Sequence, residues 1–476
     1  MKSKTIFFLS LILFLSIFLH FFRLSHPQSV VFDEQWYASS VYSYFKNTHY
    51  FDVHPPLGKL LIAASGYLFG FEKPLSDNNF NYRFDDPYPR IKNYLPLRFL
   101  PAFLGALLPL LGWLTARSLG ASEKSSFLVA IFFLFENALL VQSRLILLEI
   151  ILVFFSLFSL FFYLQYKKQK KYTKKKLLFL FLLGISLGCA ISVKWTGLII
   201  LVIVVFLELI RLDNEQSKKK AKLFSFLSQK KKEIGKLFLF LIILPVLFYL
   251  ASFAVHFSLT QLPKNPSDMT DPFLYGKEEK TEKTFSDISY KAPEGNFFQK
   301  LVKTHKHMLG VVGIEKEHPY SSHWWQWVFG EKPMLYYLEN NSRLYLMGNS
   351  LVWFCGFLGV FMFFLIPLYK KKEKIKSPKF FKEPTILYFY LFSWLFFIGV
   401  LRTSFLYYYL IPLCFSIIIF GLCFDFYTQK LNKKTKNIIF VFLIILCFLA
   451  FVFFLPLTYG FPLSDKAVLL REAIPF

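Results

Sequence analysis

The stretch that decides the fold is MKSKTIFFLSLILFLSIFLHFF, residues 1–22. Lys2 and Lys4 precede an apolar run that approaches the roughly 20 residues a helix needs to cross a bilayer. A signal peptide also places positive charge before an apolar run, but no small-residue cleavage site follows here and the run is long. We therefore expect an uncleaved first membrane span near residues 5–22.

The rest of the chain has the same apolar character. Of its 476 residues, 55% are hydrophobic, only 18% are charged and 63 are phenylalanine. A soluble fold could not cover so much apolar surface with so few charges. Lipid admits only helices and closed barrels, and the ten-residue alternation typical of a barrel is absent. The sequence predicts an all-α polytopic membrane protein.

About eleven apolar stretches have a length suited to crossing the membrane. Short polar interruptions at residues 142–144, 194–196 and 402–404 divide the three longest stretches into pairs. The predicted spans are 5–22, 97–115, 125–141, 145–165, 177–193, 195–211, 236–257, 345–369, 384–401, 403–426 and 438–457.

The net charge of +25 reflects lysine runs such as KKQKKYTKKK (residues 167–176) and KKKEKIKSPK (residues 370–379). With the N-terminus in the cytoplasm, these runs all lie in cytoplasmic loops, as the positive-inside rule expects. Acidic and basic residues nearly cancel in the two long outer loops, and the C-terminus lies outside. The lysine runs lack interleaved aromatics and a folded domain, so the charge does not indicate nucleic-acid binding.

The long outer loops divide the chain into three parts. These are an N-terminal transmembrane module (1–257) whose first outer loop (23–96) holds the predicted site, a large extracytoplasmic loop (258–344) and a C-terminal transmembrane module (345–476). In the first outer loop, FDVHPPLGKLLIAASGYLFGF (residues 51–71) has about 14 apolar residues after Pro56, too few to span. We expect an interfacial helix there, with Pro56 in its first turn.

Most polar residues that the topology does not explain lie near the predicted outer face. Asp33 and Glu34 occur in VVFDEQWYASS, residues 30–40, which follows the first span. Within a turn or two of the same face lie His54, Lys59, Arg98, Glu136, Asn137, Gln142, Arg144, Glu149 and Arg402. A solvated loop is the commoner explanation for any single acidic pair, but charges in or near spans are costly and usually mark function.

These residue types suit transfer of a group from a lipid phosphate. Adjacent carboxylates point in different directions, so Asp33 and Glu34 cannot straddle one glycosidic bond. One carboxylate can act alone as a general base when the leaving group is a phosphate, and arginines can bind that phosphate. The acidic pair in RFDDPYPR (Asp85, Asp86) is more typical of a turn than of a metal site, and the five cysteines show no metal-ligand spacing.

Several motifs together resemble the protein O-mannosyltransferases, a family of GT-C membrane glycosyltransferases. FDE at 32–34 and DVHPPLGK at 52–59 carry the most specific part of the resemblance. It continues in order along essentially the whole chain through PLRFLPAFLGAL (96–107), ENALLVQSRLILLE (136–149), SVKWTGL (192–198), SHWWQWVFGEKPMLYYLE (322–339), RTSFLYYYLIPL (402–413) and PLTYGFPLS (456–464).

The resemblance implies a GT-C fold and an activity. Such enzymes move mannose from a dolichyl or polyprenyl phosphate to Ser or Thr hydroxyls of proteins, with inversion. It implies that Asp33 is the base with Glu34 beside it, and that His54, Lys59, Arg98, Arg144 and Arg402 bind donor phosphate or sugar. Glu136, Asn137, Gln142 and Glu149 would support the site. Glu149 stands where the family more often has aspartate.

The resemblance also implies a setting. The loop 258–344 is too short for the β-trefoil insertion of eukaryotic members, so we expect a prokaryotic enzyme in the bacterial cytoplasmic membrane with its site facing outward. Its partners would be the lipid-linked mannose donor, an acceptor protein and, because members often pair, a second chain. The chemistry requires no divalent cation, although the sequence does not exclude one.

Three alternatives remain open. A sister GT-C enzyme would transfer another sugar, such as aminoarabinose, to lipid A or an envelope glycolipid. A lipid transporter without chemistry would show inverted repeats and broken helices at mid-membrane, but the Asp33 loop has no counterpart in the second half. An inactive scaffold subunit should lose the acidic base, which this chain retains.

Overall fold

The computed structural model describes residues 3–72, 87–169, 173–219, 223–261, 293–312, 318–400 and 402–473. The acidic pair at 85–86 and residues 262–292 and 313–317 of the large outer loop lie outside these ranges. The described helices are α1 (Ser3–Phe21), α2 (Glu34–Lys46), α3 (Leu57–Leu68), α4 (Leu95–Leu119), α5 (Glu123–Leu134), α6 (Asn137–Ser143), α7 (Glu149–Lys168), α8 (Lys174–Val193), α9 (Leu198–Lys219), α10 (Leu223–Phe238), α11 (Leu244–Ser258), α13 (Phe297–Val312), α14 (Ser350–Glu373), α15 (Lys379–Lys382), α16 (Thr385–Leu395), α17 (Leu410–Tyr427), α18 (Lys433–Tyr459) and α19 (Asp465–Glu472).

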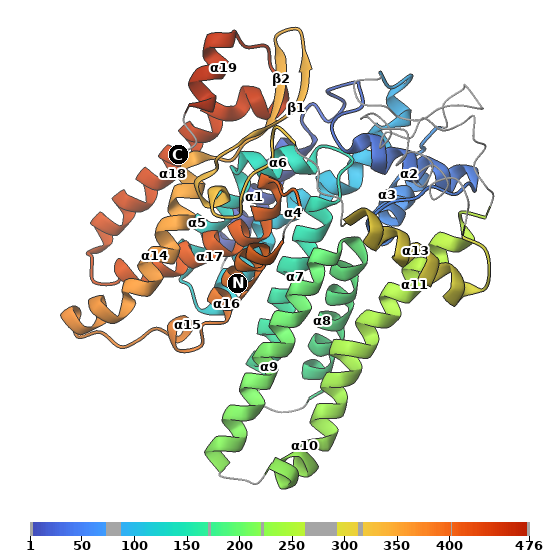
Figure 1. Ribbon diagram of the computed structural model, residues 1–476. Coiled ribbons are helices and arrows are strands. Elements are labelled where there is room, and N and C mark those ends of the chain that lie inside the picture. The colour runs from blue at the N-terminus through green and yellow to red at the C-terminus, as the bar shows by residue number, and fades with distance from the viewer. Residues whose placement is uncertain are drawn as a thin grey trace.

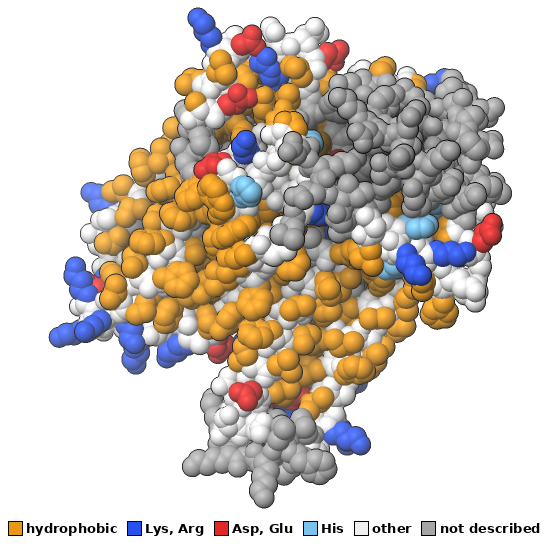
Figure 2. Space-filling view, in the orientation of Figure 1, with side chains coloured by type: hydrophobic (Ala, Val, Ile, Leu, Met, Phe, Trp, Pro, Cys, Tyr) orange, Lys and Arg blue, Asp and Glu red, His pale blue; other side chains and the backbone are white. Residues whose placement is uncertain are grey.

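Long helices form a bundle; the strands β1 and β2 and the helices α2, α6 and α19 lie toward one end of it, and α10 and α15 lie toward the other (Figure 1). The helix α17 occupies the middle and packs against α14, α16 and α5, which joins the C-terminal helices to the N-terminal ones. On the face shown in Figure 2, hydrophobic side chains form a broad belt, and several Lys and Arg side chains lie along its lower edge. This distribution is typical of a membrane protein, and the predicted helical membrane fold is confirmed.

The predicted count of spans is slightly too high. Nine helical segments in the described ranges are long and apolar enough to cross a membrane, and a tenth is counted if the bent pair α5–α6 is one span. The predicted span 384–401 is a shorter apolar helix, Thr385–Gly399, and the predicted span 125–141 is bent by 54° between α5 and α6.

Polar groups explain the bend between α5 and α6. The Glu136 carboxylate precedes α6 and accepts a hydrogen bond from the Ala138 backbone N–H, at 3.1 Å, so it caps the new helix. It also accepts from the Asn349 backbone N–H and from Trp353 Nε1 at 3.1–3.3 Å, which ties the break to the start of α14. The apolar pattern alone predicts one continuous span here, because it does not reveal which distant residues contact Glu136.

A two-stranded hairpin departs from the all-α prediction. Strands β1 (Met334–Glu339) and β2 (Ser342–Leu346) pair antiparallel at the same end of the bundle as α2 and α19 (Figure 1). The predicted span 345–369 therefore begins too early, since α14 starts at Ser350. The segment LYYLENNSRLYL is short and is followed at once by a long apolar helix. Its end is therefore predicted as the start of that helix and not as part of a strand.

The first outer loop folds onto the bundle. It contains α2 and α3, and α3 packs against α4, α8 and α11. Pro56 immediately precedes α3, close to the predicted first-turn position. The helix buries Lys59 and Ile62, while Tyr67 and Leu68 at its end are largely exposed. A short apolar helix with one buried and one exposed part agrees with the interfacial helix expected from the sequence.

Candidate functional site

A large cavity lies where the first outer loop meets the ends of α8, α9 and α16. Its volume is about 860 Å³, and the polar side chains on its wall are those of His54, Lys194, Thr196, His305, Arg402 and Tyr408. These residues are far apart in the sequence; His305 lies on α13, and the others lie in or beside turns that meet at the same end of the bundle. The cavity concentrates positive charge at the edge of an otherwise apolar bundle.

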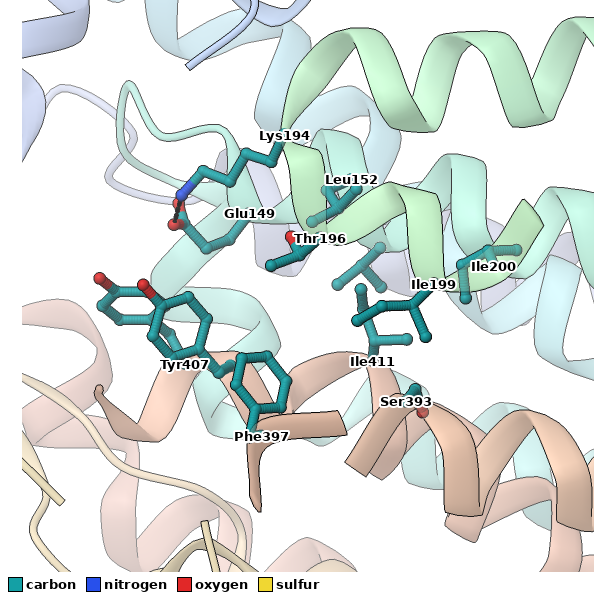
Figure 3. A pocket seen from close by; sticks show the side chains of 12 residues that line it. Glu149, Leu152, Lys194, Thr196, Ile199, Ile200, Ser393, Phe397, Tyr407 and Ile411 are labelled. Carbon is teal, nitrogen blue, oxygen red and sulfur yellow. Dashed lines mark hydrogen bonds and ion pairs between the residues drawn. The ribbon is translucent and has the colours of Figure 1, made fainter. Parts of the chain in front are cut away.

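Two smaller spaces continue from this cavity. An apolar groove of about 500 Å³ shares Trp195, Leu198 and Phe396 with it and runs between α9 and α16, where its wall is almost wholly hydrophobic. A narrow pocket of about 30 Å³ opens from it and shares Lys194, Thr196, Phe397 and Tyr408 with it. Figure 3 shows Lys194 and Glu149 joined at one end of this pocket, with the Tyr407 ring facing them.

Lys194 stands at the junction of the cavity and the pocket. It follows α8, is 4% exposed and forms an ion pair with Glu149. Its ammonium nitrogen also lies 5.6 Å from the centre of the Tyr407 ring and 5.9 Å from that of Tyr37. Burial lowers the pKa of Lys194, but Glu149, Tyr408 and Asp33 together outweigh that effect, so the pKa is raised and the side chain stays charged.

The two adjacent carboxylates of the first outer loop lie in different surroundings. Asp33 occupies the position before α2, is half-buried, and does not cap the helix with its side chain. Burial and, to a smaller extent, the nearby Glu149 carboxylate together raise the pKa of Asp33 to about 7, against the opposing charge of Lys194. Asp33 is therefore a carboxyl group whose pKa suits proton transfer near neutrality.

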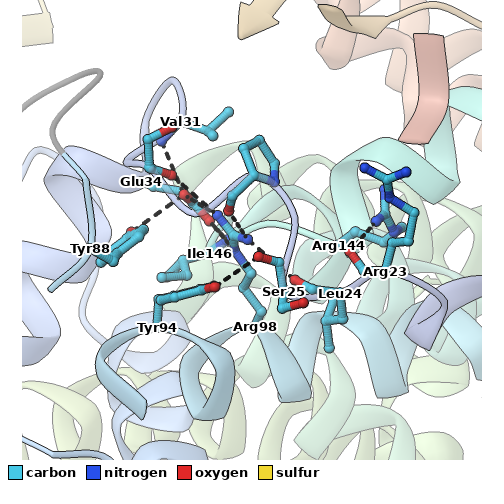
Figure 4. A network of polar contacts seen from close by, with 12 residues as sticks. Arg23, Leu24, Ser25, Val31, Glu34, Tyr88, Tyr94, Arg98, Arg144 and Ile146 are labelled. Carbon is cyan, nitrogen blue, oxygen red and sulfur yellow. Dashed lines mark hydrogen bonds and ion pairs between the residues drawn. The ribbon is translucent and has the colours of Figure 1, made fainter. Parts of the chain in front are cut away.

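Glu34 is instead fully buried and paired. Arg98 Nε and Nη2 donate to Glu34 Oε1 and Oε2, both at 2.8 Å (Figure 4). The backbone N–H groups of Val31 and Ile146 donate to the same carboxylate at 3.0 and 2.9 Å, and the Tyr88 hydroxyl at 3.3 Å. A carboxylate with this many donors is held in one orientation.

The remaining donors of Arg98 are also in use. Its Nη1 donates to the carbonyls of Leu24 and Pro27 at 3.2 and 2.8 Å, and its Nη2 reaches the Ser29 carbonyl at 3.5 Å. The side chain is 0% exposed. This geometry disagrees with the prediction that Arg98 binds donor phosphate, because its guanidinium is already engaged by the loop around it.

Arg144 is also bound to backbone carbonyls, although its buried Nε has no hydrogen-bond partner among the described residues. It is 1% exposed, and it donates to the carbonyls of Thr458, Phe22 and Arg23 at 3.0, 3.2 and 2.7 Å. Its guanidinium also lies 4.4 Å from the centre of the Tyr459 ring. Arg144 thus joins the end of α1 to the end of α18, and the predicted phosphate contact does not fit this position either.

The HPPLGK motif forms a compact polar turn. The Asp52 carboxylate accepts the His54 backbone N–H at 2.6 Å and lies 3.2 Å from Lys59 Nζ. Lys59 also donates to the His54 carbonyl at 2.9 Å, and only 2% of it is exposed. Lys59 therefore fixes the turn that places His54 on the cavity wall. Burial and the charges of Lys194, Lys59 and Arg402 lower the pKa of His54 well below its usual range.

Arg402 is placed as a ligand-binding arginine should be. It is half-buried on the cavity wall, and its Nη2 donates to the Tyr408 hydroxyl at 2.6 Å. One hydrogen bond leaves most of its guanidinium free among the described residues. Of the three predicted phosphate arginines, Arg402 is the one that faces the cavity.

The predicted supporting residues connect the helices behind the cavity. Glu136 ties α6 to α14, and Asn137 Nδ2 donates to Thr458 Oγ1 of α18 at 2.7 Å. Gln142 Nε2 donates to the Tyr336 hydroxyl at 2.6 Å, and the Tyr336 ring stacks on Phe32 with centres 4.2 Å apart. Glu149 differs from these residues because it reaches the cavity system itself.

Two residues of the site are not prominent in the sequence. A lysine beside a tryptophan, as Lys194 is, suggests only a group that orients its neighbour, and Asp52 does not stand out in its loop. A signal exists for Lys194, because a lysine at the outer end of two spans is not explained by the positive-inside rule. Within the described ranges, no group of three or more His, Cys, Asp or Glu side chains could hold a metal ion.

Comparison with known proteins identifies the family. Residues 10–260 match the family described as dolichyl-phosphate-mannose-protein mannosyltransferase, and residues 297–475 match the C-terminal four-transmembrane region of protein-O-mannosyltransferase. The Candida albicans dolichyl-phosphate-mannose–protein mannosyltransferase 6 is 33% identical over 262 residues, which is 51% of this chain and 30% of that protein. The mouse protein O-mannosyl-transferase 1 is 31% identical over 244 residues, 50% of this chain and 31% of that one.

Solved structures agree on the fold. The Saccharomyces cerevisiae protein O-mannosyltransferase Pmt1-Pmt2 complex bound to the sugar donor gives a TM-score of 0.83 at 19% identity, over 99% of this chain and 92% of that one. The oligosaccharyltransferase AglB of Archaeoglobus fulgidus gives 0.54 at 12% identity, over 100% of this chain and 60% of that one. The expected GT-C fold is confirmed. The aligned region is about a third of the length of the curated relatives. The chain belongs to the dolichyl-phosphate-mannose–protein mannosyltransferase family.

Proposed function

We propose that this chain transfers mannose, with inversion, from a polyprenyl phosphate to Ser or Thr hydroxyls of proteins. The observation that carries the proposal is the order of the three spaces. An apolar groove leads to a cavity with cationic side chains, and that cavity leads to a narrow pocket with a carboxylate and tyrosines. A lipid-linked sugar donor has the same order: hydrocarbon tail, phosphate, sugar.

The phosphate would lie between Lys194 and Arg402. Both face the cavity, and His54 beside them is neutral because its pKa is lowered. A guanidinium and an ammonium group can stabilise the negative charge that grows on the phosphate as it leaves. In this proposal Arg98, Arg144 and Lys59 act indirectly, by holding the loops that carry Asp33 and His54.

Asp33 would act as the general base. It accepts the proton of the acceptor hydroxyl while the hydroxyl oxygen attacks the anomeric carbon of mannose. The bond between that carbon and the phosphate oxygen breaks on the opposite face, and the phosphate leaves as an anion with the bonding electron pair. Attack opposite the leaving group inverts the anomeric centre. Asp33 then releases its proton to water, so the step is balanced without a cofactor.

The setting of the reaction is part of the proposal. The lysine-rich loops favour a cytoplasmic N-terminus, an outward-facing cavity and an extracytoplasmic C-terminus. The short second outer loop, 258–344, favours a prokaryotic enzyme in the bacterial cytoplasmic membrane. The yeast relative forms a complex of two chains, and we include pairing with a second copy of this chain, to be measured as the mass of the protein in detergent.

The test is transfer of labelled mannose from polyprenyl phosphate to a Ser/Thr-rich peptide by the purified protein. Transfer to hydroxyl side chains supports the proposal. If the protein binds the donor and transfers its sugar to an envelope glycolipid but to no peptide, the proposal is wrong and the chain is a sister GT-C enzyme. Movement of the lipid across vesicle membranes without any sugar transfer would instead indicate a transporter.

A further inference from the structure

Glu149 has one carboxylate oxygen in use and one without a partner. It is the first residue of α7, 5% exposed, on the wall of the narrow pocket. Its Oε1 accepts from Lys194 Nζ. Its buried Oε2 has no hydrogen-bond partner among the described residues. A buried acceptor that stays unpaired costs free energy, so a group that donates to it gains affinity.

The surroundings of Oε2 define which group that would be. The carboxylate repels an anion, so the phosphate cannot lie against it. Lys194 already supplies the balancing positive charge, so a second cation is not required. Tyr407, Tyr408 and Thr196 complete the polar end of the pocket, where aromatic rings carry hydroxyl groups (Figure 3). A neutral hydrogen-bond donor fits this environment, and a sugar hydroxyl is such a donor.

We propose that Glu149 Oε2 accepts a hydrogen bond from a ring hydroxyl of the donor sugar, and that Glu149 thereby helps to determine which sugar is transferred. This inference rests on the proposed function. In the donor the sugar is bonded directly to the phosphate. In the protein, Lys194 lines the cavity assigned to the phosphate and is paired with Glu149, so Glu149 lies where the sugar is expected. The sugar is the group next to the phosphate, so it lies beside Lys194 at the mouth of the pocket, where the pocket opens into the large cavity.

Lys194 makes the Glu149→Gln variant informative. Lysine only donates, so it holds the oxygen of the substituted amide toward itself. The NH₂ group of that amide then points into the pocket, where it presents a donor to the sugar hydroxyl instead of an acceptor. The variant keeps the size of the side chain but replaces the acceptor Oε2 with an NH₂ group, which donates.

The experiment compares wild type and Glu149→Gln with mannosyl donors that each lack a single hydroxyl. With wild type, one deoxy donor should lose roughly 10- to 100-fold in kcat/KM, as expected for a hydrogen bond to a charged group. In Glu149→Gln, removal of the same hydroxyl should cost no more than about twofold, since the contact is already absent. For each donor, the ratio of kcat/KM between wild type and variant cancels the intrinsic reactivity of that donor.

One control variant and three possible outcomes decide the inference. Glu72→Gln, in the first outer loop, half-buried and paired with Lys92, should show the wild-type pattern. Equal losses in wild type and Glu149→Gln for every deoxy donor would overturn the inference. So would a wild type that uses every deoxy donor as well as mannose, and this measurement stands even if the variant fails to fold. Absence of transfer from the complete mannosyl donor would instead remove the proposed function, and the inference with it.

Discussion

Arg98 and Glu34 meet through two parallel hydrogen bonds, from Nε to Oε1 and from Nη2 to Oε2, each 2.8 Å long. Both side chains are 0% exposed. Removing one partner of such a pair leaves an uncompensated buried charge, which costs about 3–5 kcal/mol. We therefore expect Arg98→Ala to lower the thermal unfolding temperature of the purified protein markedly. An Arg98→Ala protein that is as stable as wild type but binds donor poorly would show that Arg98 contacts the phosphate.

Arg402 should behave in the opposite way. It is half-buried at the cavity and donates a hydrogen bond to Tyr408. We expect Arg402→Ala to weaken donor binding by roughly 10- to 100-fold, the effect of losing a charge-assisted hydrogen bond, with little change in unfolding temperature. Tyr408→Phe, which removes only the hydroxyl partner, is the matched comparison and should have a smaller effect. Normal donor affinity in Arg402→Ala would contradict this assignment.

The apolar groove predicts a dependence on lipid length. Leu391 lies on its wall between α9 and α16. Leu391→Trp should fill part of the groove and raise KM for a long-chain donor, while KM for a donor with a short tail should change little. Leu178→Trp, at an exposed position of α8, is the control for a new tryptophan facing lipid. Equal effects on long and short donors would argue against the groove as the tail site.

The pKa of Asp33 predicts the pH dependence of the reaction. Its value is raised to about 7, and the base must be ionised to accept a proton. The rate constant kcat/KM should therefore fall as the pH drops below about 7 and level off above it. In Glu149→Gln the midpoint of the residual activity should move to lower pH, because the Glu149 carboxylate raises the pKa of Asp33. An unchanged midpoint would mean that another group titrates.

Much of the fold follows from the sequence, since bilayer thickness sets the length of each apolar run. The break before α6 could not be predicted, because it depends on Glu136 meeting Asn349 and Trp353, which are distant in the sequence. The hairpin β1–β2 could not be recognised because an apolar helix follows it directly.

The site was predictable as a set of residues but not as an arrangement. Asp33 and Glu34 are neighbours, yet only the packing of α4 decides that Arg98 pairs with Glu34 rather than with Asp33. Arginines near the outer face look alike in the sequence. Arg98 and Arg144 bind backbone carbonyls, whereas Arg402 faces the cavity. Which arginine binds backbone and which faces the cavity depends on how the outer loops pack against one another, and the sequence pattern does not show that packing.

The most direct test of the account is mannose transfer by Asp33→Asn, measured beside wild type with donor binding recorded in parallel. Losing a general base lowers rates by about 10²- to 10⁴-fold, so we expect kcat to fall by that amount while the donor still binds. Asp465→Asn, an exposed carboxylate on α19, should leave transfer unchanged. Transfer at the wild-type rate in Asp33→Asn would contradict the account, because Glu34 is held by Arg98 and cannot take over.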